Sequence, residues 1–71
     1  MRKPRPRLDP VTLRWFADQH EATARRYAKH SDDCARAGNQ AGAWGWGDDA
    51  YSERMAAKRL RNLATRAEGE R

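Results

Sequence analysis

Few side chains in this sequence could carry out chemistry. His30 and Cys34 are four residues apart, so a helix would place an imidazole and a thiol on one face, where both could bind one metal ion. A structural zinc site needs four ligands, and the other histidine, His20, lies nearly three helical turns from His30. We therefore predict no metal site. Cys34 is interpreted as a small buried apolar residue, and His20 as a seam histidine bonded to a polar neighbour, either Tyr51 or a residue of a partner chain.

Motifs for catalysis or cofactor binding are not recognisable. No serine stands beside a histidine in a known arrangement, and no glycine-rich segment matches a phosphate-binding loop. The aspartate pairs at 32–33 and 48–49 suit charge pairing and helix capping better than acid–base catalysis. We expect a protein that binds another molecule, with no enzymatic activity, no cofactor and no small-molecule substrate.

Two helices are predicted to position these residues, giving an all-α, two-helix antiparallel hairpin. Asp9 can cap free N–H groups, and Pro10 suits the first helical position, where its missing N–H costs nothing. The next glycine is Gly38, so the first helix is predicted over 10–37. Asp48 or Asp49 suits the start of a second helix, which is predicted over 49–67 with a frayed tail at 68–71.

Residues spaced alternately by four and three positions predict the seam along which the two helices pack. The second helix offers fewer such positions than the first, and alanine is frequent in both seams. The predicted seam residues are Leu13, Ala17, His20, Ala24, Tyr27, Ser31 and Cys34 in the first helix, and Ala56, Leu60, Leu63 and Ala67 in the second.

Residues 38–48 are predicted to form a long loop rich in tryptophan and glycine. Four of the five glycines lie between positions 38 and 47, and each glycine inside a helix costs about 1 kcal/mol relative to alanine. Gly38, followed by Asn39, is a natural left-handed cap for the first helix. In an extended loop, alternation would turn Trp44 and Trp46 to opposite sides, one toward the hairpin and one outward.

The net charge of +5 is concentrated ahead of the first helix. Three prolines at positions 4, 6 and 10 predict that residues 1–8 form a disordered basic arm attached to a hairpin over residues 9–71. Such an arm either contacts phosphates or acts as a solubilising terminus. Its basic residues are Arg2, Lys3, Arg5 and Arg7.

The chain is short of large apolar residues for a stable monomer. It has 71 residues, of which 38% are hydrophobic, and many of these are alanine. We predict that two hairpins dimerise into a four-helix bundle, which would bury Trp15 and Phe16. The alternatives are a hairpin that completes its core on a different protein, and a monomer whose Trp44 and Trp46 fold over its end.

Composition also predicts where the protein acts. A single cysteine, with no apolar run long enough for a signal sequence or a membrane span, indicates the cytoplasm and no membrane partner.

The function predicted from the sequence is that of a helical interaction or adaptor protein, because Trp, Tyr and Arg often anchor interfaces. The predicted contact residues are Trp44, Trp46, Tyr51, Met55, Trp15 and Phe16. The alternative is a nucleic-acid-binding accessory factor that neutralises phosphates with its arm and second helix. That alternative uses Arg2, Lys3, Arg5, Arg7, Arg54, Lys58, Arg59, Arg61 and Arg66.

Overall fold

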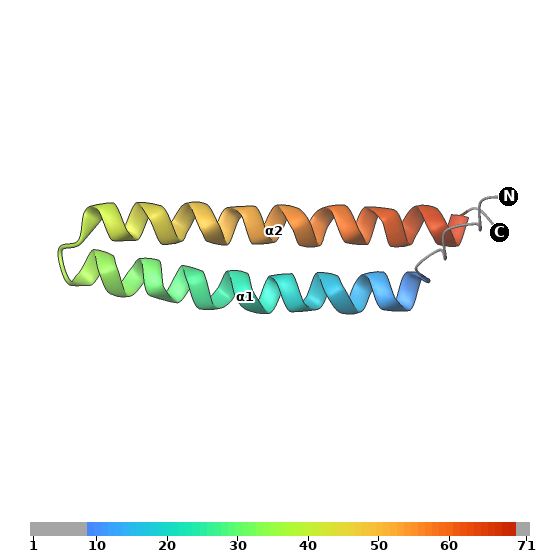
Figure 1. Ribbon diagram of the computed structural model, residues 1–71, viewed down its shortest axis with the longest axis horizontal. Helices are drawn as coiled ribbons and strands as arrows, with labels where there is room; N and C mark the ends of the chain where they lie inside the picture. The colour runs from blue at the N-terminus through green and yellow to red at the C-terminus, as the bar shows by residue number, and fades with distance from the viewer. Residues whose placement is uncertain (1–8, 70–71) are drawn as a thin grey trace, which may run out of the picture.

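The computed structural model is an antiparallel hairpin of two long helices (Figure 1). Helix α1 spans Pro10–Arg36 and helix α2 spans Gln40–Gly69. The structure describes residues 9–69, so the arm predicted for residues 1–8 and the last two residues of the predicted tail lie outside it. The helices lie side by side as one layer, only 13 Å thick along its shortest axis. The all-α hairpin predicted from the sequence is confirmed.

Helix α1 begins where its capping residues indicate. Asp9 is extended, and its Oδ1 accepts a hydrogen bond from the backbone N–H of Thr12 at 2.7 Å. This bond, made to the ionised carboxylate, lowers the pKa of Asp9. Pro10 occupies the first turn. The end of α1, at Arg36, is one residue before the predicted one.

The turn between the helices consists of residues 37–39. Gly38 has a φ of +78°, the left-handed conformation that glycine adopts without steric cost. Its N–H donates to the carbonyl of Ala35 at 3.1 Å, and the N–H of Asn39 donates to the carbonyl of Cys34 at 2.8 Å. These are the two hydrogen bonds of a Schellman C-cap, so the predicted role of Gly38 is confirmed.

Asn39 ends one turn and starts the next helix. Its Oδ1 accepts the N–H of Gly42 at 3.0 Å, and its carbonyl accepts the N–H of Ala43 at 3.0 Å. Asn39 is therefore the N-cap of α2 as well as the last residue of the α1 cap. Because one residue serves both helices, the connection is short.

The loop predicted over residues 38–48 is wrong, because α2 starts at Gln40 and not at 49. Gly42 belongs to the cap: a Cβ built there would lie 2.5 Å from Nδ2 of Asn39. Gly47 faces α1, where an added Cβ would lie 3.6 Å from Oγ of Ser31. The helical cost of these glycines is about 1 kcal/mol each, and packing of α2 against α1 outweighs it.

The core of the hairpin is a row of alanines spaced by seven residues. A seven-residue spacing keeps side chains on one side of a supercoiled helix, and a methyl group lets the partner backbone come close. The hydroxyl of Ser31 accordingly donates to the backbone carbonyl of Ala43 at 2.6 Å. The buried residues are Leu13, Ala17 and Ala24 in α1, and Ala43, Ala50, Ala57 and Ala64 in α2.

The predicted seam of α1 agrees with this core, whereas the predicted seam of α2 is wrong at two of its four positions. The buried residues there are Ala57 and Ala64, each one position after the predicted Ala56 and Leu63, and Leu63 is 48% exposed. Leu60 and Ala67 are half-buried beside the alanine row. Leucine indicates a seam position by its larger apolar area. The helices instead pack through the smallest side chains, which permit the closest approach.

Enlarging a seam alanine should destabilise the hairpin. Ala57 is 1% exposed, so Ala57→Leu would force the helices apart and lower the free energy of unfolding by about 1–3 kcal/mol. The matched control is Ala22→Leu, on the exposed surface of α1, which should leave stability almost unchanged. Urea denaturation followed by circular dichroism measures both, and equal effects would contradict the alanine seam.

Replacing a glycine should have opposite effects in the helix and in the turn. A Cβ at Gly45 would meet no atom within 4 Å, so Gly45→Ala should stabilise the protein by about 1 kcal/mol through helix propensity. Gly38→Ala should destabilise it by about 1 kcal/mol, because φ at this position is +78°. Thermal melts followed by circular dichroism test both variants, and lower helicity of Gly45→Ala at low temperature would contradict a helical segment there.

Candidate interaction surfaces

Trp46 is the tryptophan that packs against α1. Its ring centroid lies 5.3 Å from that of Tyr27 and 4.8 Å from that of His30, within the range of favourable aromatic contacts. Trp46 is 36% exposed, so its ring is partly covered by these neighbours. It therefore ties α2 to α1 near the turn and belongs to the hairpin itself.

Farther from the turn, the same side of the hairpin holds a hydrogen-bonded contact between the helices. His20 Nδ1 lies 2.5 Å from Glu53 Oε2, and both side chains are partly exposed. His20 therefore contacts a polar residue of the other helix, as expected, but the partner is Glu53 and not Tyr51. The side that contains the pair His20–Glu53 and the ring of Trp46 is called the His20 side below.

The opposite side of the alanine row carries a ladder of ion pairs and is called the Arg61 side. Arg61 bonds Glu21 at 2.5 Å and Asp18 at 3.0 Å, and Arg14 pairs with Glu68. The hydrogen bond from Arg61 lowers the pKa of Glu21, and that bond also raises the pKa of Arg61. These charges are already neutralised within the hairpin.

The basic residues predicted to contact phosphates differ in whether they form ion pairs within the hairpin. Arg61 is engaged by two carboxylates of α1. Within residues 9–69 no ion pair forms at Arg54, Lys58, Arg59 or Arg66, so these four remain available. The other four, Arg2, Lys3, Arg5 and Arg7, lie outside the described residues.

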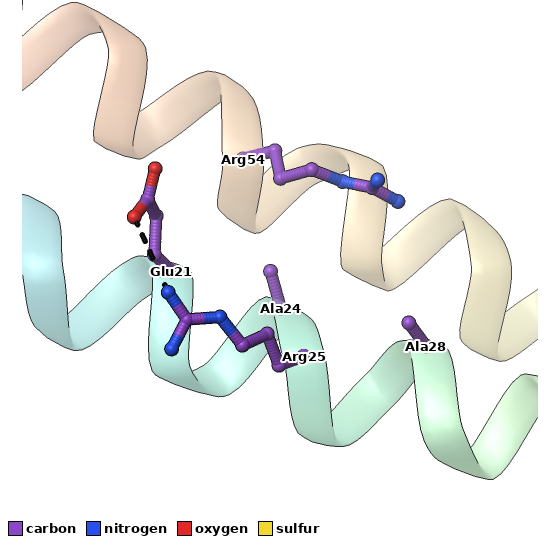
Figure 2. A pocket seen from close by; sticks show the side chains of 5 residues that line it. All are labelled: Glu21, Ala24, Arg25, Ala28 and Arg54. Atoms are coloured by element: carbon purple, nitrogen blue, oxygen red, sulfur yellow. Dashed lines mark ion pairs between the residues drawn. The ribbon is translucent and has the colours of Figure 1, made fainter.

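A shallow pocket of about 210 Å³ opens on the Arg61 side (Figure 2). Ala24 and Ala28 leave space between the helices, and Glu21, Arg25 and Arg54 surround it. Figure 2 shows Arg25 turned toward Glu21, which lies 3.8 Å away, while Arg54 runs along the other helix with its guanidinium away from both. Because the polar groups do not converge, this pocket is a gap over small side chains and we assign it no ligand.

The part of the chain that the structure describes contains no group of three or more His, Cys, Asp and Glu side chains that could hold a metal ion. Cys34 is a free, half-buried cysteine in α1.

An exposed apolar strip follows the outside of α2 near the turn. Trp44 and Tyr51 each come directly after a seam alanine and are therefore turned about 100° from the seam. They are seven residues apart on one face, and they are 66% and 61% exposed. Met55 follows Tyr51 by one turn and is half-buried. We call these three residues the Trp44 strip.

A second group of exposed apolar residues lies toward the open end, where α1 begins and α2 ends. Trp15 and Phe16 form an edge-to-face pair with centroids 5.1 Å apart, and both remain exposed. Val11 and Leu63 are also exposed, and neither was among the predicted contact residues. For Leu63 the available signal was the seven-residue alanine repeat, which places this leucine outside the seam.

The six predicted contact residues thus occupy three places. Trp44 and Trp46 point to opposite sides, as predicted, but the reason is helical and not extended geometry. Side chains two positions apart in a helix are rotated by about 200° around its axis. The structure brings together the Trp44 strip and, separately, the pair Trp15–Phe16. Trp46 contributes to the hairpin.

No family model matches this chain, and neither does any curated protein or solved structure. Neither α1 nor α2 has a stretch with the length and hydropathy that crossing a membrane requires.

Removing the two tryptophan rings should have unequal effects on stability. Trp46→Ala should lower the free energy of unfolding by about 1–3 kcal/mol, because contacts with Tyr27 and His30 are lost. Trp44→Ala should change it by no more than about 0.5 kcal/mol, since that ring is mostly in solvent. Denaturant titrations compare the two, and an equal loss for both would contradict the different environments of the rings.

Proposed function

We propose that this chain is a non-enzymatic helical interaction protein, which pairs with a second copy and binds another protein through the Trp44 strip. The observation that carries the proposal is where the apolar residues lie. The buried core consists of one leucine and six alanines, and no large side chain in residues 9–69 is fully buried. The large apolar residues that remain exposed are Val11, Trp15, Phe16, Trp44, Trp46, Tyr51 and Leu63.

The chemistry of the Trp44 strip supports a protein partner. Tryptophan and tyrosine bury a large area with few rotatable bonds, so they anchor interfaces at a low entropic cost. A flexible methionine one turn from Tyr51 adapts to irregular surfaces. An exposed strip of this kind suits a groove or a helix on the partner.

The thinness of the hairpin supports pairing with a second copy. A single layer of two helices has one seam and leaves both broad faces in solvent, whereas stable domains pack at least two layers. Alanines bury little area against the entropy lost on folding. A second hairpin stacked on the first would form a four-helix bundle and cover part of the exposed apolar surface. The single cysteine suits the cytoplasm, where we propose that the protein acts.

The second candidate function is nucleic-acid binding. It is favoured by Lys58, Arg59 and Arg66, which lie in the half of α2 nearer the open end and form no ion pair within residues 9–69. In the sequence, the basic segment immediately precedes α1, whose first residue lies at that end. Such a surface would contact phosphates in a salt-dependent way without reading bases.

Affinity capture from host extract tests the leading function. The variant Trp44→Ser/Tyr51→Ser should retain helicity and lose a captured protein at least about tenfold, because it removes the aromatic anchors. Val11→Ser, another exposed apolar position, is the matched control and should retain it.

Equal capture by both variants would contradict a role for the Trp44 strip. A gel-shift titration at two salt concentrations tests the alternative, because binding that weakens steeply with salt and requires Arg59 and Arg66 would favour nucleic acid over a protein partner.

A further inference from the structure

We infer that the second copy docks antiparallel on the His20 side, with the turn end of one hairpin against the open end of the other. The inference rests on the self-association proposed above and adds the face and the orientation. Three independent features carry it: the location of exposed apolar residues, the distribution of unpaired charge, and a repeat of side-chain size along α2.

The His20 side carries exposed apolar residues in addition to the Trp44 strip and Val11, which lie toward the Arg61 side. Phe16 precedes His20 by one helical turn, so it lies on this side of α1, and Leu60 and Leu63 follow Glu53 by two to three turns on α2. Phe16 and Leu63 are 41% and 48% exposed, and Leu60 is half-buried. The Arg61 side instead carries the ion pairs of Arg61 and Arg14, whose burial would incur a desolvation cost.

Charged residues on the outer surface of α2, next to the His20 side, change sign along the helix. Asp49 lies in the half near the turn, whereas Arg59 and Arg66 lie in the half near the open end. None of the three forms an ion pair with another residue in 9–69. Antiparallel stacking brings the acidic half of one copy to the basic half of the other, while parallel stacking would bring like charges together.

A second row of α2 residues has the spacing of a helix interface, alternating three and four positions. Its half near the turn contains two glycines, an aspartate and a serine, and its other half ends in three large residues after Ala56. Such a row is self-complementary only when two copies run antiparallel, with large residues over small ones. The row is Gly42, Gly45, Asp49, Ser52, Ala56, Arg59, Leu63 and Arg66.

The charge match and the size match select the same register. A two-fold axis that pairs Arg59 with Asp49 of the partner also pairs Leu63 with Gly45 of the partner, because each is four residues farther from the axis. Gly45 has open space where a Cβ would point, so it leaves room for a leucine. The Trp44 strip lies outside this row and stays accessible in the dimer.

Sedimentation equilibrium of the full chain tests the face. Leu63→Glu should raise the dimer dissociation constant at least about tenfold with helicity retained, because this side chain is exposed in the single hairpin. Val11→Glu, an equally drastic change at a 77% exposed position near the Arg61 side, should leave it unchanged. If Leu63→Glu does not weaken the dimer, docking on the His20 side is wrong, although the chain still self-associates.

Charge reversal tests the orientation. Arg59→Glu and Asp49→Arg should each raise the dissociation constant about three- to tenfold, and the double variant should return it to within about threefold of the original value. No recovery in the double variant overturns the antiparallel register. A wild-type chain that remains monomeric at about 100 µM overturns the proposed self-association itself. The variant Trp44→Ser/Tyr51→Ser should still dimerise. Loss of protein binding through the Trp44 strip is therefore distinguished from loss of the dimer.

Discussion

The close approach of α1 and α2 at the alanine row is the constraint on which the rest of the structure depends. With methyl groups at the seam, the backbones come near enough for Ser31 to bond the carbonyl of Ala43. Polar side chains also meet across the helices on both sides of the row, as in the pairs His20–Glu53 and Arg61–Glu21. The same alanines bury little apolar area, so the hairpin holds its register well but has a thin core.

Because the core consists mainly of alanines, most of the large apolar side chains lie outside it. Helical geometry separates Trp44 from Trp46, so one ring stabilises the hairpin and the other lies in solvent. Ion pairs between the helices lie on the Arg61 side, whereas on the His20 side Phe16 and Leu63 remain exposed. The two sides of the hairpin therefore differ in how α1 and α2 contact each other.

The glycines between 42 and 47 illustrate how tertiary contacts override local preference. Judged by propensity, they predict a loop, yet all three are helical and two of them face other residues closely. Gly42 makes room for the capping side chain of Asn39, and Gly47 faces Ser31 across a narrow gap. Asn39, a good N-cap directly after the left-handed Gly38, is the signal for an early helix start. The number of glycines favours a loop only when each is judged by its own propensity.

The sequence by itself determined the hairpin, the start of α1 at the Asp9 cap, the turn at Gly38 and the seam of α1, because caps and a repeat of four and three act through neighbours within one or two turns. Only the tertiary structure decided the start of α2, the phase of its seam, and the positions of Trp46 and Leu63. The physical reason is that these features depend on how closely two helices approach. That distance follows from the match of small side chains between residues far apart in the chain, whereas the alanine repeat of α2 alone does not decide against the larger leucines as seam residues.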